Sequence, residues 1–253
     1  MLEIKRLHLA QVEVVGEQWP VHGFVVTHPG GALLVDTGVG GPDEMLSDWR
    51  VVNRTAADAL ADIDMSPADI DLVINTHLHF DHCGWNTVRS GDRVVATFPN
   101  AKYYVQKQEW EHGRLQLERD AISYLSPNYD PLIEIGQMVL LNGDQELLPG
   151  ISVKVFPGHT ANMQAVIIES GGAGSEKKKA CYISDLIPTS NHLDLTWVMA
   201  FDLFPLETIE SRKKYYAQAI PERWLTVFTH DDATPWGYVE RGERGRLGLA
   251  VPR

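Results

Sequence analysis

Residues 72–82 have the sequence Leu72-Val73-Ile74-Asn75-Thr76-His77-Leu78-His79-Phe80-Asp81-His82, a short apolar run followed by four metal-binding side chains. The apolar run predicts a buried strand. A loop after such a strand often holds catalytic groups, because the sheet is rigid while the loop backbone can aim side chains. His77 and His79 are two positions apart, so both imidazoles lie on the same side of an extended segment. This stretch therefore predicts a metal site at the end of a strand.

The histidine and aspartate side chains of residues 77–82 are compatible with several metals and do not single out one. Imidazole together with carboxylate suits zinc, and it also accepts iron, cobalt, nickel or manganese. The alternative is a histidine-rich surface loop, or core histidines that are satisfied by hydrogen bonds. The density of the pattern favours the metal site, since a lone histidine is the usual case for that alternative.

Three later segments each end an expected strand in a residue that can bind a metal. Residues 151–156 end in the turn Pro157-Gly158-His159-Thr160, residues 180–184 end in Asp185, and residues 225–229 end in His230 and Asp231. Convergence of such segments at one edge of a sheet predicts a dinuclear site. Taken singly, His159 or His230 is more often a hydrogen-bonded turn histidine, and Asp185 a helix cap.

In their order along the chain, these residues resemble the motifs of the metallo-β-lactamase fold superfamily. The motifs are Asp36-Thr37-Gly38, residues 77–82, Pro157-Gly158-His159-Thr160, Ser184-Asp185 and Thr229-His230. Three more segments resemble the branch of predicted metal-dependent hydrolases related to N-acyl homoserine lactonases and methyl parathion hydrolase. These are Gly84-Trp85-Asn86-Thr87, Phe98-Pro99-Asn100-Ala101 and Glu109-Trp110-Glu111-His112. The resemblance spans nearly the whole chain, to about His230.

The resemblance implies an α/β fold of four layers, an αβ/βα sandwich of two mixed β-sheets with helices on the outer faces. It implies a single metallo-β-lactamase-like hydrolase domain over residues 1–253, a length at which a two-sheet sandwich commonly stays one domain. It also implies two divalent metal ions, zinc by expectation, with iron, manganese, cobalt or nickel as alternatives. By motif position, one ion takes His77, His79 and His159, the other takes Asp81, His82 and His230, and Asp185 bridges the two.

The expected function is a dinuclear metal-dependent hydrolase, whose metal-bridging hydroxide attacks a lactone or a carboxylic ester with an apolar portion. Asp81 is the expected catalytic residue, because a carboxylate that contacts metal and water can orient the nucleophile and then carry a proton to the leaving group. Trp85, Trp197 and Phe201 are expected to bind the apolar portion of the substrate. Core packing or a dimer interface is the alternative for each of these three.

Pro188 departs from the homoserine lactonases that the chain resembles, which carry a tyrosine three positions after the bridging aspartate. That tyrosine helps to polarise the substrate carbonyl, whereas proline donates no hydrogen bond, so the contact is absent or comes from elsewhere. Tyr182, His192 and His22 are candidate replacements that also have structural explanations. The true zinc β-lactamases match poorly, because they are exported and do not normally present a bridging aspartate at the place of Asp185.

Four other functions stay open. Two are hydrolases of the same kind, a glyoxalase II-like thioester hydrolase and a phosphotriesterase. The third is an iron-dependent oxidoreductase similar to the persulfide dioxygenases, which predicts one metal ion per chain. The fourth is a non-catalytic interaction protein that a metal ion stabilises, which requires closed coordination.

The composition narrows the partners. The 34 acidic and 22 basic residues give a net charge of −12, which disfavours a nucleic-acid partner, since a groove that follows phosphates needs a basic surface. No stretch approaches the roughly 20 apolar residues of a membrane helix, and residues 1–6 lead into a strand pattern. We therefore expect a cytoplasmic enzyme with a small-molecule substrate and no membrane partner, and a homodimer stays open.

Two further features concern the packing. Cys83 and Cys181 give no disulfide framework, and Cys83 is either a further metal ligand or, as its crowded neighbourhood favours, a core residue. Residues 106–125 predict an amphipathic helix, with Trp110, Leu117, Ile122 and Leu125 on its buried face.

Overall fold

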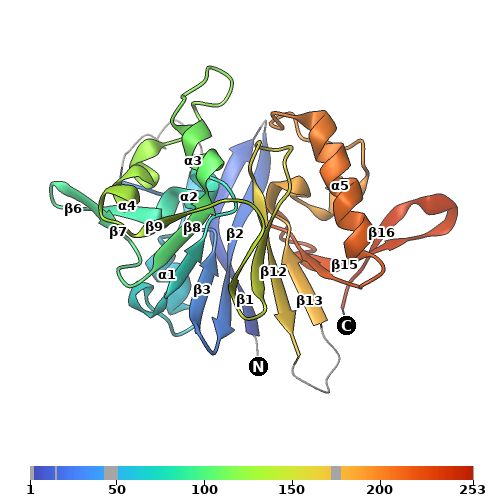
Figure 1. Ribbon diagram of the computed structural model, residues 1–253, viewed down its shortest axis with the longest axis horizontal. Helices are drawn as coiled ribbons and strands as arrows, with labels where there is room; N and C mark the ends of the chain where they lie inside the picture. The colour runs from blue at the N-terminus through green and yellow to red at the C-terminus, as the bar shows by residue number, and fades with distance from the viewer. Residues whose placement is uncertain (1–2, 15, 43–50, 172–177, 253) are drawn as a thin grey trace. The chain divides into compact units, whose positions relative to one another are not determined.

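The computed structural model describes residues 3–14, 16–42, 51–171 and 178–252 (Figure 1). The chain divides into two compact units, Met1–Asn142 and Gly143–Arg253. Each unit contains one seven-stranded sheet that mixes parallel and antiparallel strands. The sheets, with the helices that pack on them, confirm the expected α/β class.

Among the described residues, the first unit contains a large sheet, a small hairpin and four short α-helices (blue to green in Figure 1). The sheet has the order β4-β1-β2-β3-β5-β8-β9. Its strands are β1 (Glu3–Val14), β2 (Glu17–His28), β3 (Gly31–Val35), β4 (Val51–Asn53), β5 (Leu72–Ile74), β8 (Lys102–Gln106) and β9 (Met138–Leu141). The hairpin is β6 (Thr87–Ser90) with β7 (Arg93–Ala96), and the helices are α1 (Ala56–Ala61), α2 (Phe80–Cys83), α3 (Lys107–Gly113) and α4 (Asp130–Glu134).

Strands β3, β5, β8 and β9 run parallel, so their carboxyl ends lie at one edge of the sheet. Val35, the last residue of β3, pairs with Ile74, the last residue of β5. Asp36 and the histidine-rich loop therefore start side by side. Helix α3, which carries Glu109, follows β8 at the same edge. Parallel pairing thus gathers three polar segments that are far apart in the sequence.

Hydrophobic packing on one face fixes this sheet. In α1, Ala56, Ala59 and Leu60 recur at helical spacing and are buried in a cluster with sheet residues such as Leu9 and Val73. Thr55 caps α1 by accepting a hydrogen bond from the backbone N–H of Asp58. Leu132 of α4 joins the same cluster. Helices and sheet thus share one apolar layer in this unit.

The second unit contains a sheet whose spatial order follows the chain, β10 to β16 (yellow to red in Figure 1). Its strands are β10 (Gln145–Leu148), β11 (Ile151–Val155), β12 (Gln164–Ser170), β13 (Lys178–Tyr182), β14 (Leu225–Val227), β15 (Trp236–Arg241) and β16 (Leu247–Ala250). Strands β13 and β14 pair in parallel, and the long helix α5 (Pro205–Ala219) lies in the connection between them.

Helix α5 buries a face that is largely polar. Pro205 stands in its first turn, where the missing N–H does not weaken the helix. Its buried residues are Thr208, Ser211, Arg212, Tyr215, Tyr216 and Ala219. The two tyrosine rings and Ala219 pack in one apolar cluster with strand residues that include Ile167 and Cys181. The polar groups of this face instead bond to loops, as described below.

The helix expected over residues 106–125 is wrong beyond Gly113. Helix α3 ends there, and Gln116 has a left-handed backbone with φ 49°. The Gln116 side chain donates hydrogen bonds to the carbonyls of Gly113 and Tyr124, which close the segment into a turn. Leu117 and Ile122 are exposed as a result.

Two other expectations concern the chain as a whole. Within the described residues, no helix is long and apolar enough to cross a bilayer. The single domain over residues 1–253 stays a prediction.

Candidate metal centre

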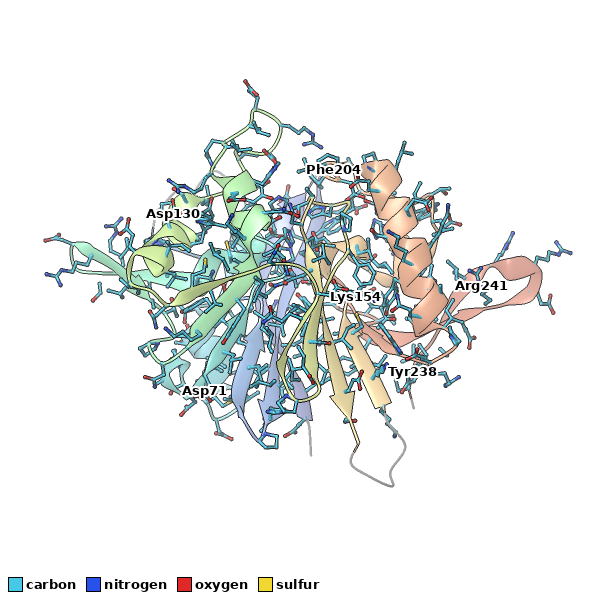
Figure 2. The ribbon with its side chains drawn as sticks, in the orientation of Figure 1. Asp71, Asp130, Lys154, Phe204, Tyr238 and Arg241 are labelled. Atoms are coloured by element: carbon cyan, nitrogen blue, oxygen red, sulfur yellow. The ribbon has the colours of Figure 1, made fainter. Side chains whose placement is uncertain are left out.

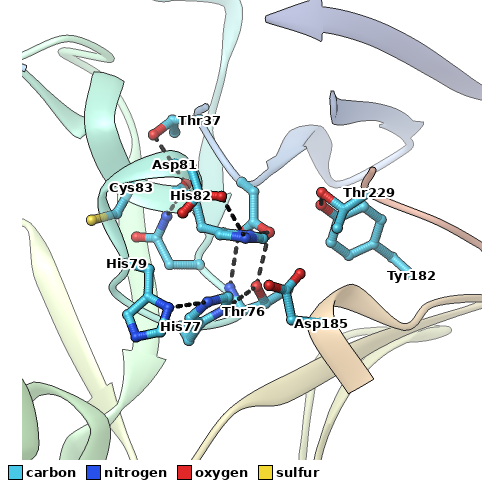
Figure 3. A network of polar contacts seen from close by, with 12 residues as sticks. Thr37, Thr76, His77, His79, Asp81, His82, Cys83, Tyr182, Asp185 and Thr229 are labelled. Atoms are coloured by element: carbon cyan, nitrogen blue, oxygen red, sulfur yellow. Dashed lines mark hydrogen bonds and ion pairs between the residues drawn. The ribbon is translucent and has the colours of Figure 1, made fainter. Parts of the chain in front are cut away.

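The histidine-rich loop of the first unit presents two pairs of ligand atoms. Nε2 of His77 lies 3.1 Å from Nδ1 of His79, as the dashed line in Figure 3 shows. Nε2 of His82 lies 3.6 Å from Oδ2 of Asp81. One ligand atom of His77 also lies within 4.8 Å of one of His82, so the two pairs are neighbours.

These separations fit metal binding. Two ligand atoms that bind one tetrahedral zinc ion at about 2.0–2.1 Å lie roughly 3.3 Å apart. The two pairs in the first unit, at 3.1 and 3.6 Å, lie on either side of that value. The four expected ligands of this unit are thus together and suitably spaced for a divalent metal ion.

Asp36 fixes the orientation of His82. Its Oδ2 lies 2.8 Å from Nδ1 of His82 and accepts a hydrogen bond from the Thr76 hydroxyl, also at 2.8 Å. Its Oδ1 accepts the backbone N–H of Thr76. A carboxylate on Nδ1 makes that nitrogen the donor and leaves Nε2 of His82 as the metal-binding atom. The residue holds a left-handed backbone at φ 53°, so it is placed by its surroundings rather than by its own preference.

Glu109 holds the same loop through a hydrogen bond to its backbone, a role that the sequence did not suggest. Its buried Oε1 accepts hydrogen bonds from the backbone N–H of Leu78, at 3.2 Å, and from the Tyr124 hydroxyl, at 2.7 Å. Leu78 stands between the two ligands His77 and His79. The Tyr124 ring meets the His79 ring edge-on, with centroids 4.8 Å apart. Burial, and then the charge of Glu109, raise the pKa of Tyr124, so its hydroxyl stays a donor.

Cys83 has the surroundings of a core residue. Its Sγ donates to the carbonyl of Leu78, 3.3 Å away, and its side chain is part of the apolar cluster of the first unit. In Figure 3 the sulfur points away from the labelled histidines. Burial raises the pKa of the Cys83 thiol, as expected for a cysteine in an apolar core. The core interpretation is the one that the structure supports.

The second unit brings its three expected ligands together around one carboxylate. His159 follows β11, Asp185 follows β13 in a short 3₁₀ turn (Ser184–Leu186), and His230 follows β14. Oδ2 of Asp185 lies 3.4 Å from Nε2 of His159, and Oδ1 lies 3.3 Å from Nε2 of His230. Each oxygen therefore faces a different imidazole at the spacing of two ligands on one metal ion. A carboxylate that bridges two metals needs this arrangement.

Asp202 positions His159 as Asp36 positions His82. Its Oδ1 lies 3.1 Å from Nδ1 of His159, and its Oδ2 accepts a hydrogen bond from the Thr208 hydroxyl at 2.9 Å. This leaves Nε2 of His159 as the ligand atom, which is the nitrogen that faces Asp185. The sequence offers no signal for Asp202, since it is a single aspartate 43 residues from its partner.

Helix α5 reaches all three ligand-bearing segments of this unit. The Ser211 hydroxyl donates to the carbonyl of Pro157, two residues before His159. Nε of Arg212 donates to the carbonyl of Leu186, next to Asp185. The Tyr215 hydroxyl bonds to that of Thr226, on the strand that leads to His230. The polar face of α5 thus contacts all three segments that carry the expected ligands of the second unit.

The candidate replacements for the lactonase tyrosine each have a structural contact. The Tyr182 hydroxyl donates to Thr229 at 2.8 Å (Figure 3). Nδ1 of His192 lies 2.8 Å from the Thr189 hydroxyl, and the His22 ring lies 5.3 Å from the ring of His8. The carbonyl of Pro188 accepts the backbone N–H of His230. Pro188 therefore helps to place His230 through its backbone carbonyl.

The three expected substrate contacts differ in exposure. Trp85 packs partly buried against the apolar cluster of the first unit, with its ring directly over Gly40. Trp197 and Phe201, in the segment before α5, are 61% and 47% exposed. Packing accounts for the position of Trp85 and does not account for that of the other two. A role in substrate binding stays a prediction for all three.

Comparison with known proteins extends these observations. Residues 16–230 match the sequence model of the family described as the metallo-beta-lactamase superfamily. The N-acyl homoserine lactonase AttM of Rhizobium radiobacter is 25% identical over 238 residues, which cover 86% of this chain and 83% of the relative.

Two solved structures show the same fold. A crystal structure of a probable metal-dependent hydrolase from Staphylococcus aureus has a TM-score of 0.82 and 24% identity, and covers 100% of this chain and 98% of its own. AidC, a dizinc quorum-quenching lactonase solved with the product N-hexanoyl-L-homoserine, has a TM-score of 0.70 and 20% identity. That match covers 94% of this chain and 81% of AidC.

Proposed function

Because the chain belongs to the metallo-β-lactamase superfamily, we propose that it is a dinuclear metal-dependent hydrolase of lactones or of carboxylic esters with an apolar portion. Membership confirms the resemblance and the expected class, a metal-dependent hydrolase. The observation that carries the finer proposal is the position of Asp185, whose two oxygens face His159 and His230 separately. A carboxylate in that position suits two ions and not one.

We assign the ligands by combining this geometry with the motif order of the family. His77, His79 and His159 would hold one ion, Asp81, His82 and His230 would hold the other, and Asp185 would bridge them. The pairs within each unit support the assignment, since all four separations lie between 3.1 and 3.6 Å. That the two ligand sets serve one centre is part of the proposal, and it is supported by the family.

The metal ions would supply the electrostatic part of the chemistry, by making a water molecule acidic enough to attack at neutral pH and by drawing electron density from the substrate carbonyl. The protein holds the ligands in the correct tautomers through Asp36 and Asp202. The side chain of Asp81 is 20% exposed, whereas that of His82 beside it is fully buried. Asp81 is therefore suited to receive a proton and to pass it to the leaving group.

The preference for lactones and esters is supported by the relatives and by the aromatic residues. One relative is named as an N-acyl homoserine lactonase, and one similar structure is a lactonase with its product. Trp197 and Phe201 offer exposed apolar surface in the segment that follows Asp185. A small-molecule substrate with an apolar portion fits this surface. The homodimer and the cytoplasmic location stay predictions.

Metal analysis combined with a substrate panel tests the proposal. The panel contains lactones, aryl esters, thioesters, phosphotriesters and phosphodiesters, assayed while metal is titrated into metal-free protein. We expect hydrolysis of lactones or esters that reaches its maximum at two equivalents of metal. One equivalent with oxygen consumption would instead indicate the persulfide dioxygenase-like alternative, and selective cleavage of thioesters or phosphotriesters would overturn the substrate class.

A matched pair of variants tests the role of Asp81. Asp81→Asn keeps an oxygen ligand but loses the carboxylate that carries the proton. Asp92→Asn makes the same change in the exposed turn between β6 and β7. We expect Asp81→Asn to lower kcat by about 10²-fold or more and Asp92→Asn to leave it unchanged. Full turnover of Asp81→Asn at full metal content would remove the proton-transfer role.

A further inference from the structure

The segment from Ile187 to Phe204 joins the ligand Asp185 to helix α5 and carries the exposed aromatic side chains of this unit. Trp197, Phe201 and Phe204 are 61%, 47% and 38% exposed. Figure 2 labels Phe204, which directly precedes α5. We name Ile187–Phe204 the aromatic loop. It contains one 3₁₀ turn (Ser190–Leu193) and no strand, so other residues must hold it in place.

Arg212 of α5 holds this loop at several points through one guanidinium group. Its Nε donates to the carbonyl of Leu186 at 2.7 Å. Its Nη1 donates to the carbonyls of Asp194 and Trp197 at 2.9 and 2.8 Å. The first acceptor adjoins Asp185, and the last belongs to an exposed aromatic residue. One rigid group therefore links the ligand end of the loop to its aromatic part.

The surroundings of Arg212 are unusual for a charged residue. It is fully buried, and it forms no ion pair among the residues that the structure describes. Within the same part of the chain, its Nη2 has no hydrogen-bond partner. Burying a guanidinium without a carboxylate at ion-pair distance is unfavourable, and an apolar side chain at this position would avoid that penalty. An apolar residue could not replace its hydrogen bonds to the carbonyls of Leu186, Asp194 and Trp197.

We propose that Arg212 is a positioning residue that couples the aromatic loop to Asp185 and thereby sets the preference for substrates with an apolar portion. The substrate part rests on the proposed function, whereas the anchoring part does not. The planar fork is essential, because it directs several N–H groups to fixed positions at once. A lysine ammonium at this position keeps the charge but has a different shape and cannot reproduce that geometry.

The experiment compares Arg212→Met, Arg212→Lys and the wild type, with Lys213→Met as the matched control. Lys213 is the next residue of α5, is exposed, and pairs only with Glu210 among the described residues. Hydrogen exchange of residues 187–204 in the metal-loaded protein measures anchoring. The KM for a lactone with a long acyl chain, compared with that for an unsubstituted lactone, measures selectivity.

We expect both Arg212 variants to speed exchange in the aromatic loop by about tenfold or more, because the loop loses its fixed carbonyl contacts. We expect their KM for the long-chain lactone to rise about fivefold or more relative to their KM for the unsubstituted lactone, whereas any loss of kcat should be the same for both lactones. Lys213→Met should resemble the wild type throughout.

Two results would overturn the inference. Unchanged exchange in both Arg212 variants would remove the anchoring. The second is a KM that changes equally for the two lactones, or a kcat that alone falls in proportion to the fraction of misfolded protein. Either outcome would show that Arg212 contributes only to the stability of the fold. If the wild type hydrolyses no lactone or ester, the proposed function fails and the selectivity part fails with it. The exchange data then still decide whether Arg212 anchors the loop.

Discussion

Asp36 and His82 form a buried pair in which Oδ2 of the carboxylate lies 2.8 Å from Nδ1 of the imidazole, across 46 residues of sequence. Parallel pairing of β3 with β5 creates the pair, since it sets the end of one strand beside the loop of the other. The same carboxylate also accepts two hydrogen bonds from Thr76. Both oxygens of Asp36 therefore have hydrogen-bond partners on Thr76 or His82.

Asp36→Asn should weaken metal binding without unfolding the protein. Asparagine tolerates the left-handed backbone at this position, but its amide turns an NH₂ group toward either the Thr76 N–H or Nδ1 of His82. In the second case His82 must carry its proton on Nε2, which then cannot bind a metal. We expect metal affinity to fall about 10- to 100-fold, measured by competition with a chromogenic chelator.

The control for this experiment is Asp71→Asn in the same unit. Asp71 accepts the backbone N–H of Ala32 and lies outside the ligand contacts. Figure 2 labels it on the first unit. Equal affinity in Asp36→Asn and Asp71→Asn would show that the carboxylate does not set the tautomer of His82.

Glu109→Leu should destabilise the fold, whereas Glu109→Gln should be tolerated. Leucine leaves the N–H of Leu78 and the hydroxyl of Tyr124 buried without their acceptor, while glutamine keeps one carbonyl oxygen for both. We expect a loss of about 2 to 4 kcal/mol in the free energy of unfolding for leucine, and under about 1 kcal/mol for glutamine. Urea unfolding measures both, and equal losses would contradict the role of the Oε1 contacts.

Gly158→Ala should disturb the segment that carries His159. Gly158 has φ +148°, and an added Cβ would lie 2.4 Å from Oγ1, 2.5 Å from Cα and 2.6 Å from N of Thr208. Two of these atoms are backbone atoms of α5, so the helix or the loop has to move. Gly245→Ala is the control, because Gly245 also has a positive φ, +75°, but has open space around it.

We expect Gly245→Ala to lower the free energy of unfolding by about 1 to 2 kcal/mol, through backbone strain alone. Gly158→Ala should lose at least about 1 kcal/mol more through the collision, and should also bind metal more weakly. Thermal unfolding with and without metal separates the two effects. Equal losses of stability and of metal binding in the two variants would show that the close approach of α5 to this loop does not require glycine at position 158.

Neither cysteine should react in the folded protein. Burial raises the pKa of the Cys83 and Cys181 thiols, so neither forms a thiolate near pH 8. A thiol-reactive chromogen should therefore detect no fast-reacting group in the native state. It should detect two after denaturation, which is the number in the sequence. One fast equivalent in the native state would place a cysteine at the surface.

The residues of the candidate metal centre could be picked out because their signal in the sequence is local. Four ligand-type side chains follow one short strand, and three more stand where later apolar strands end. The structure brings these residues together within each unit, with Asp185 between His159 and His230. The two mixed sheets followed from the resemblance that the same motifs carry.

The sequence suggested Asp36 as a residue that orients a ligand, with a turn or capping role as the alternative, whereas the other residues that hold the expected ligands had no such signal. Asp202, Glu109 and Arg212 act through contacts that span 15 to 43 residues of sequence. Helix α5 was missed for a related reason. Its buried face contains threonine, serine and arginine, so apolar residues do not recur at helical spacing. In residues 106–125 a helix was predicted where none continues. Apolar residues recur there at helical spacing, but those beyond Gly113 such as Leu117 and Ile122 are exposed.

The polar face of α5 also bears on how the second unit assembles during folding. The strands of this sheet are neighbours in sequence order, so adjacent strands can pair early and at little loss of chain entropy. An isolated helix of this length is marginal in water, and the hydroxyl partner of Tyr215 lies on β14, which comes after the helix in the chain. We therefore expect α5 to dock late, after the hairpins. The second unit's part of the proposed metal site would then form in one cooperative final step, once β14 has paired with β13 and α5 has docked.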